Sequence, residues 1–181
     1  MNVATNVLII DDDADVRRSA RVALSSEVGH VELIESPAGI ENHLAARSFE
    51  VVLLDMNFVS GERNGTAGLN ALSRVLAFDA TIAVVLMTAY GGVSLAVESL
   101  KQGAVDFILK PWRNEKLIAA VHTAAKLAQS RRHAETLQLD ALERNAIERA
   151  LSKHAGNISA AANALGLSRA ALYRRMSKHG L

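Results

Sequence analysis

The sequence predicts an α/β protein built on a doubly wound, five-stranded parallel sheet, followed by a small all-α domain. Three observations lead to this prediction. Short apolar runs rich in Val, Ile and Leu recur along residues 7–109. Amphipathic stretches long enough for helices separate these runs. Beyond residue 138 the runs give way to short amphipathic stretches separated by glycines.

The apolar runs do not alternate with polar residues, which is typical of strands buried on both faces of a parallel sheet. They are Val7–Ile10, Val31–Ile34, Val51–Leu54, Ile82–Met87 and Phe107–Leu109. The stretches between them carry apolar residues at helical spacing. They are Ala14–Ser26, Gly39–Arg47, Ala67–Ala77, Val93–Gln102 and a stretch from Glu115 onward. This alternation predicts a ligand site outside the carboxyl ends of the strands.

Composition restricts the class of protein. The 181 residues are 50% hydrophobic and include no cysteine, which removes disulfides, thiolate zinc sites and cysteine nucleophiles. No apolar run approaches the roughly 20 residues that cross a bilayer. The N-terminus has no basic segment or cleavage site before Asp11. We therefore expect a cytoplasmic protein that does not associate with membranes.

The net charge of +1 conceals an asymmetry along the chain. Residues 1–131 contain 12 basic and 15 acidic side chains, whereas residues 132–181 contain 8 and 4. From Gly156 onward there is no acidic residue, and the basic residues are Arg169, Arg174, Arg175 and Lys178. A basic terminal module favours a polyanionic ligand, although an excess this small also suits a solvated surface.

Polar side chains follow the ends of the predicted strands. They are Asp11, Asp12, Asp55, Thr88 and Lys110. Because the carboxyl ends of parallel strands share one edge of a sheet, these groups are expected to converge. Crowded carboxylates repel one another unless a cation lies among them, and oxygen ligands favour a hard ion such as Mg²⁺. One acid also suits the start of the first helix, and we assign that capping role to Asp13 or Asp15.

These residues lie in segments that resemble the receiver domains of two-component response regulators, which have a flavodoxin-like fold. The segments are IIDDD at 9–13, LLDMN at 53–57, MTAY at 87–90 and DFILKP at 106–111. The resemblance covers residues 1–122. It implies that Asp55 is the phosphoacceptor and that Thr88 and Lys110 contact the phosphoryl group. It also implies a Mg²⁺ site made by Asp12, Asp55 and the backbone carbonyl of Asn57, with Asp11 acting through water.

The same resemblance implies a conformational switch formed by Thr88 and Phe107, although a core position suits Phe107 equally well. Lys110–Pro111 resembles the cis-proline pair of the family. Tyr90 either gates the site or lies on the surface. The resemblance is interrupted at residues 56–67, where the loop is several residues longer than usual and lacks the proline of the family. Loops of this composition tolerate added length, so we expect the fold to be retained.

Residues 123–138 are expected to link the two domains, either as an extension of the preceding helix or as a loose segment. Asp140 is expected to open a helix that ends near Gly156. Ser159 is expected to cap a helix at 160–165 and Ser168 a second at 169–178, with a turn at Gly166. The expected core residues are Ala161, Ala164, Leu165, Leu167, Leu172 and Met176. The expected exposed residues are Arg169, Tyr173, Arg174, Arg175 and Lys178.

Helices joined by such a glycine turn have the geometry of a helix-turn-helix, although a small bundle with a basic surface is the alternative. The segment GNISAAANALGLSRAALYRRMSKHGL at 156–181 resembles the DNA-binding motif of the Fis family. The resemblance implies that Arg169 and Ala171 face bases, with Ser168 and Arg174 near base edges or the backbone. The implied phosphate contacts are Asn157, Ser159 and Arg175. It further implies a homodimer formed through residues 139–151.

The two resemblances imply a response regulator that a sensor histidine kinase phosphorylates on Asp55 and that then binds double-stranded DNA and regulates transcription. Phosphorylation is expected to favour the dimer. Its own Mg²⁺-dependent phosphorylation and slow dephosphorylation are the only chemistry expected, so the chain is not classed as an enzyme. The motif G-x-x-x-x-G-K-[ST] is absent, so no ATPase module is expected. The alternatives are a phosphorelay or protein-interaction module, whose C-terminal bundle binds a protein, and a phosphatase-type enzyme.

Overall fold

A computed structural model describes residues 5–58, 65–89 and 93–181, without the side chains of residues 93–96. The chain forms two compact units, Met1–Arg131 and Arg132–Leu181. The division falls inside residues 123–138, the range that the sequence predicts as the link. In the described ranges, no helix combines the length and the apolar character needed to span a membrane.

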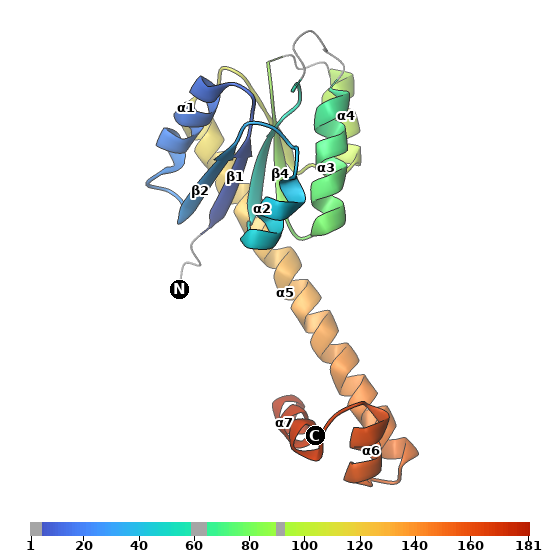
Figure 1. The fold of residues 1–181 in the computed structure, drawn as a ribbon. Coiled ribbons are helices and arrows are strands. Elements are labelled where there is room, and N and C mark those ends of the chain that lie inside the picture. Colours follow the sequence, from blue (N-terminus) through green and yellow to red (C-terminus); the bar gives the residue numbers. More distant parts are fainter. Residues whose placement is uncertain (1–4, 59–64, 90–92) are drawn as a thin grey trace. The chain divides into compact units, whose positions relative to one another are not determined.

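The first unit contains a five-stranded parallel sheet with the order β2-β1-β3-β4-β5 (Figure 1). The strands are β1 (Asn6–Ile10), β2 (His30–Ile34), β3 (Val51–Asp55), β4 (Ala83–Thr88) and β5 (Asp106–Leu109). Each boundary lies within one residue of the predicted run. The doubly wound α/β fold predicted from the sequence is confirmed.

The prediction that every strand is buried on both faces is wrong for the two strands at the sheet edges. β2 is half-buried along its whole length, and β5 exposes three of its four side chains. Each of these strands has a neighbour on one side only. Glu32 within the run of β2 is a local sign of this exposure, whereas the run Phe107–Leu109 of β5 contains no polar residue.

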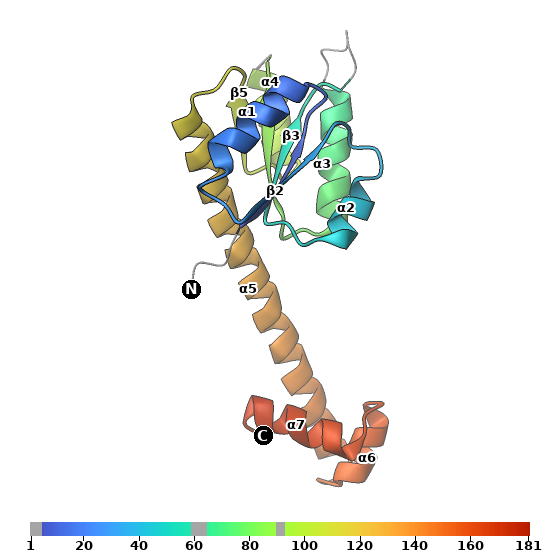
Figure 2. The same ribbon diagram turned by 60° about the vertical axis from the view of Figure 1, so that its left-hand side comes forward.

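Helices cover both faces of the sheet. α1 (Ala14–Leu24) and the first part of α5 (Asn114–Lys153) pack on one face, and α2 (Ile40–Ala46) and α3 (Thr66–Phe78) pack on the other (Figure 2). The helix α4 (Val93–Lys101) lies beside α3. Successive residues of a strand point to opposite faces, so Val7 and Ile9 join one core and Leu8 and Ile10 the other.

α5 is one continuous helix, which makes the predicted link helical and corrects the prediction that Asp140 opens a new helix. Residues 123–138 contain neither Gly nor Pro. Extending a helix fixes one residue for each hydrogen bond gained, whereas starting a new one is costly. Asp140 therefore lies within α5, where its side chain accepts a hydrogen bond from Lys178 Nζ at 2.7 Å.

The second unit consists of the last part of α5 with α6 (Ile158–Ala164) and α7 (Arg169–His179), as Figure 1 shows. Its buried core residues are Ile147, Ala150, Ala161, Ala162 and Leu172. Gly166 has a φ of 65°, and the Ser168 hydroxyl accepts a hydrogen bond from the Ala171 N–H at 3.2 Å. The predicted glycine turn and the cap of the last helix are therefore confirmed.

Two predictions for the first helix of this motif are wrong. Asn157, not Ser159, caps α6, since its side chain accepts from the Ala160 N–H at 3.1 Å. An Asn at this position satisfies an otherwise unpaired amide as well as a serine does. Ala164 is exposed and Ala162 is buried, because α6 ends at Ala164 and leaves that residue at the turn.

Candidate functional site

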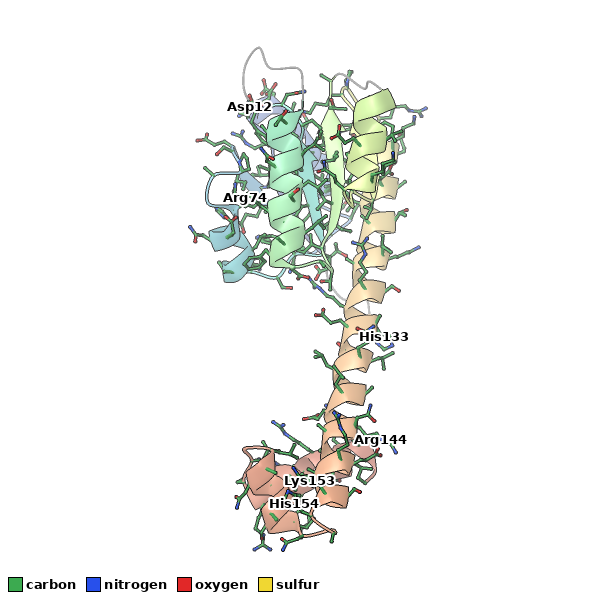
Figure 3. The ribbon with its side chains drawn as sticks, turned by 90° about the vertical axis from the view of Figure 1, so that its right-hand side faces the viewer. Asp12, Arg74, His133, Arg144, Lys153 and His154 are labelled. Atoms are coloured by element: carbon green, nitrogen blue, oxygen red, sulfur yellow. The ribbon has the colours of Figure 1, made fainter. Side chains whose placement is uncertain are left out.

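The sheet brings the predicted polar residues to one edge. Asp11 and Asp12 follow β1, Asp55 ends β3, Thr88 ends β4 and Lys110 follows β5. Side-chain oxygens of Asp11, Asp12 and Asp55 all lie within 4.8 Å of one another. Figure 3 shows Asp12 at the upper end of the first unit. The five groups predicted to converge thus lie at neighbouring strand ends.

Lys110 joins two of the carboxylates. Its Nζ lies 2.6 Å from Asp55 Oδ1 and 2.6 Å from Asp11 Oδ2. The side chains of Asp11 and Asp55 are only 0% and 5% exposed, so water screens these ion pairs weakly. The Lys110 N–H donates to the Thr88 carbonyl at 2.8 Å, which fixes the backbone beside β4, and the Lys110–Pro111 peptide is cis.

The charges at this edge are strongly coupled. Burial raises the pKa of Asp11, and this effect exceeds the opposing effect of its contact with Lys110. Burial acts to lower the pKa of Lys110, but the contacts with Asp11 and Asp55 outweigh it, so that pKa is raised. Lys110 is therefore an ammonium ion at neutral pH, and it pairs with both Asp11 and Asp55.

The donor set fits a divalent cation. Three carboxylates converge around one ammonium group, which leaves an excess of negative charge at the sheet edge. The Asn57 N–H donates to Asp55 Oδ2 at 2.9 Å, and the buried Asn57 Oδ1 has no hydrogen-bond partner within the part of the chain that the structure describes. Oxygen donors of this kind are the ligands that Mg²⁺ prefers.

The residues predicted to form the switch lie on adjacent strands. Thr88 is buried at the end of β4, and Phe107 lies on β5 with 38% of its surface exposed. A core position for Phe107 is therefore wrong, whereas its role as a switch stays a prediction. Tyr90 and residues 59–64 of the long loop lie outside the described residues.

Two residues beside the site were not foreseen. Arg17 of α1 donates a hydrogen bond from its guanidinium to the backbone carbonyl of Asp11. A Cβ at Gly68 of α3 would lie 2.6 Å from the Met56 Cα, so only glycine lets α3 approach the residue that follows Asp55. A glycine inside a helix is the one signal that could have identified this contact from the sequence.

The cap of α1 and a cleft lie next to Lys110. Asp13, not Asp15, is the cap, since its Oδ1 accepts from the Asp15 N–H at 2.7 Å and the Val16 N–H at 3.3 Å. A cleft of about 510 Å³ is lined by Asp13, Asp15, Lys110, Trp112 and other residues of α1 and the start of α5. Trp112 is the single tryptophan of the chain.

The second unit presents a basic surface on α7. The five residues predicted to be exposed, Arg169, Tyr173, Arg174, Arg175 and Lys178, are all exposed. Of the remaining predicted DNA contacts, Ser159 is exposed, Ala171 is half-buried, and Asn157 and Ser168 are helix caps. Arg175 pairs with a carboxylate of the same unit, because its Nη1 lies 3.1 Å from Glu143 Oε1.

Comparison with known proteins identifies both parts of the chain. Residues 7–122 match the response regulator receiver domain, and residues 138–179 match the Fis family of bacterial regulatory proteins. The transcriptional regulatory protein FixJ of Bradyrhizobium diazoefficiens is 32% identical over 140 residues, which cover 77% of this chain and 66% of FixJ. The C4-dicarboxylate transport transcriptional regulatory protein DctD of Rhizobium meliloti is 29% identical over 150 residues, which cover 83% of this chain and 29% of DctD.

Solved structures agree with this assignment. A crystal structure of NtrX from Brucella abortus superposes with a TM-score of 0.65 at 26% identity, covering 75% of this chain and 30% of NtrX. The N-terminal signal receiver domain of a response regulator from Bacteroides fragilis superposes with a TM-score of 0.61 at 36% identity, covering 68% of this chain and 98% of that domain. This chain therefore belongs to the response regulator family, with a receiver domain joined to a Fis-family helix-turn-helix.

Proposed function

We propose that this chain is a DNA-binding transcription regulator whose activity is controlled by phosphorylation of Asp55. The observation that carries the proposal is the buried Asp55 carboxylate, held 2.6 Å from Lys110 and clustered with Asp11 and Asp12. A carboxylate nucleophile beside an ammonium group suits phosphoryl transfer to aspartate. The Fis-family match on the same chain supports DNA as the partner of the second unit.

In the proposed reaction, a carboxylate oxygen of Asp55 attacks the phosphorus of a phosphohistidine on a sensor histidine kinase. The new O–P bond forms as the P–N bond breaks, and the imidazole leaves and takes up a proton. Lys110 forms an ion pair with the transferred phosphoryl group, and the Thr88 hydroxyl donates a hydrogen bond to it. Both side chains lie at the strand ends beside Asp55, which favours these roles.

A bound Mg²⁺ would supply neutralisation of the negative charge on the transferring phosphoryl group. The residues proposed to hold it are Asp12, Asp55 and the backbone carbonyl of Asn57, with Asp11 acting through water. The chain modifies only its own carboxylate in this scheme, by Mg²⁺-dependent phosphorylation and slow dephosphorylation. A cytoplasmic location is part of the proposal, because both the proposed kinase contact and the proposed DNA partner require it.

The second unit is proposed to read DNA with α7 in the major groove. Arg169 stands at the first position of α7, exposed and directed outward from the core. An Arg at this place can donate two hydrogen bonds to a guanine edge. The proposed base contacts are Arg169 and Ala171, with Ser168 and Arg174 beside them. The proposed phosphate contacts are Asn157, Ser159 and Arg175.

A homodimer is the proposed active form, and exposed apolar residues support it. Leu137, Leu139 and Leu142 of α5 are 55%, 60% and 62% exposed. A second exposed apolar group lies on α4 and β5 of the first unit, at Val97, Leu100, Phe107 and Leu109. Surfaces of this kind mark interaction sites. Phosphorylation is proposed to favour pairing through residues 93–125, and the helix-turn-helix units pair through residues 139–151.

The proposal is tested by mobility shift of the full-length chain on fragmented genomic DNA, with and without Mg²⁺ and beryllofluoride, which mimics a phosphoryl group. We expect a subset of fragments to bind, and to bind more tightly with the mimic. Absence of binding to any fragment would overturn the DNA-binding proposal and favour a protein ligand for the second unit.

A further inference from the structure

Half of the basic residues of α7 are already paired within the second unit. Arg175 Nη1 lies 3.1 Å from Glu143 Oε1. Lys178 Nζ lies 2.7 Å from Asp140 Oδ1 and 3.4 Å from Glu143 Oε2. Both acids lie on the last part of α5, and both basic residues lie on the C-terminal half of α7. Two carboxylates of α5 thus neutralise the C-terminal half of the helix proposed to enter the groove.

The other half of the helix is different. Among the described residues, Arg169 and Arg174 have no ion pair and their side chains are exposed. The hydrogen bond with Lys178 lowers the pKa of Asp140, and the hydrogen bonds with His179 and Lys178 lower that of Glu143. Both carboxylates are therefore negative at neutral pH, where DNA binding takes place. The positive charge of α7 is unevenly distributed along its length as a result.

We propose that Asp140 and Glu143 restrain the affinity of this helix-turn-helix for DNA by competing with DNA phosphates for Arg175 and Lys178. The inference rests on the proposed DNA-binding function. Phosphate contacts add affinity for every sequence, whereas base contacts discriminate among sequences. A basic side chain that must first leave a carboxylate contributes less to the sequence-independent affinity than one that is unpaired. The two acids thereby increase the share of binding that Arg169 and its neighbours determine by base contacts.

The charge of Glu143 can be removed by a substitution that keeps the size of its side chain. Glu143 Oε2 lies 2.7 Å from His179 Nε2, and the His179 side chain is only 8% exposed. In Glu143→Gln the side-chain amide keeps the size of Glu143 and its ability to bond His179, but loses the negative charge. Glu148→Gln is the matched control, because Glu148 lies on the same helix and, among the side chains that the structure describes, pairs only with Arg144, at 2.9 Å, one turn away. Figure 3 shows Arg144 on α5.

Binding of the full-length chain to random-sequence DNA is measured across a range of salt concentrations. Relative to the parent protein, Glu143→Gln is expected to bind about threefold or more tightly and to steepen the slope of log affinity against log salt by up to roughly 1. Glu148→Gln is expected to change neither quantity appreciably. Asp140→Asn removes the charge of the nearer of the two carboxylates beside Lys178, and it is expected to shift both quantities in the same direction as Glu143→Gln.

A second substitution separates competition from a general charge effect. Arg175→Ala is expected to weaken binding to random DNA only slightly in the parent protein, because Glu143 already occupies that guanidinium. In the Glu143→Gln background the same change is expected to cost several-fold more and to remove most of the gained affinity. This non-additivity is the signature of two residues that act on one contact.

The possible outcomes are distinct. If the parent chain and every variant fail to bind any DNA, the proposed function fails, and this inference fails with it. If the parent binds but Glu143→Gln behaves like Glu148→Gln, or Arg175→Ala costs the same in both backgrounds, only this inference is overturned. Weaker binding by both Glu143→Gln and Asp140→Asn, with unchanged circular dichroism, would also overturn it and show that the pairs only position α7.

Discussion

Lys110 Nζ lies 2.6 Å from Asp55 Oδ1, although 55 residues separate the two in the sequence. β4 lies between the strands that carry them, and the contact exists because β3 and β5 run parallel and end at the same edge. The ammonium group lies directly against a carboxylate oxygen of the proposed nucleophile, in a buried site where water screens the pair weakly.

Asp55→Asn is expected to abolish phosphorylation by acetyl phosphate and Mg²⁺, because an amide is not a nucleophile toward phosphorus. Intact-protein mass spectrometry measures the added phosphoryl group. Asp106→Asn is the control, since Asp106 lies at the start of β5 and is expected to leave labelling complete. Complete phosphorylation of the Asp55 variant would contradict the assignment of Asp55 as the phosphoacceptor.

Lys110→Ala is expected to lower the free energy of unfolding by about 3 kcal/mol at neutral pH without Mg²⁺, since two buried carboxylates lose their cation. Mg²⁺ is expected to stabilise this variant more than the parent, because the net negative charge of the site is larger. Urea denaturation with and without Mg²⁺ measures both effects. The control is Lys116→Ala, an exposed lysine of α5. An equal Mg²⁺ effect in the variant and the parent would contradict a cation site at these carboxylates.

Arg169→Ala is expected to cost roughly 1–3 kcal/mol of affinity for the operator and to relax the base preference at one position of each half-site. Selection of bound sequences from a random pool, followed by titration, measures both. Arg144→Ala removes an arginine that lies on α5 and pairs with Glu148 of the same helix, and it is expected to preserve the preference. An unchanged selected sequence in the Arg169 variant would show that another residue reads the base.

The ion pair between Glu41 of α2 and Arg74 of α3 makes the stability of the first unit depend on pH. Arg74 Nε and Nη2 lie 2.7 Å and 2.6 Å from the two Glu41 oxygens, and this contact lowers the pKa of Glu41 to about 2. A depressed carboxyl pKa contributes stability above the ordinary value of 4.5, and the contribution is lost as the pH falls through about 2. Figure 3 shows Arg74 on the side of α3 that faces α2.

Glu41→Gln is therefore expected to flatten part of the stability profile between those two values, as measured by urea midpoints at successive pH values. The side chains of Arg74 and Glu41 are 41% and 44% exposed, so solvent screening makes the effect smaller than the full shift implies. Parent and variant profiles that run parallel across this window would show that the pair contributes nothing measurable.

Beryllofluoride with Mg²⁺ is expected to raise the dimer population and the operator affinity together, by about the 1–3 kcal/mol typical of coupled sites. Two linked half-sites amplify such a modest bias, because the second contact becomes intramolecular. Sedimentation and DNA titration measure the two quantities, and Asp55→Asn serves as the protein that cannot respond. Unchanged mass and affinity in the parent protein would leave the coupling without support.

Local patterns were sufficient to predict the sheet and the convergence of Asp11, Asp55 and Lys110, because parallel topology places strand ends together whatever the details of packing. Local patterns were less reliable for individual residues. Asp140 has the chemistry of a cap, but the helix continues through it from residues 123–138, and its side chain accepts a hydrogen bond from Lys178, 38 residues away. The exposure of β5 likewise depends on its place at the sheet edge, which no property of that run encodes.

The helix caps of the second unit show a further limit of prediction from the sequence. Asn157 and Ser159 are equally suited to cap a helix, but α6 begins after Asn157 and ends at Ala164, which leaves Ala162 in the core and Ala164 at the turn. Packing against Ile147 and Leu172 resolves this choice. Gly68 approaches Met56 closely, and Glu143 pairs with Arg175. Both contacts also depend on how separate elements pack, so local sequence patterns do not predict them.

Trp112 lies in the cleft beside Lys110, two residues along the chain from the group that pairs with Asp55. Indole emission is sensitive to nearby charge and to contact with water, and no other tryptophan contributes to the signal. The chain therefore carries an intrinsic fluorophore at the rim of its proposed acceptor site. Cation binding and the occupancy of Asp55 are expected to be readable as optical signals in real time, without a chemical label.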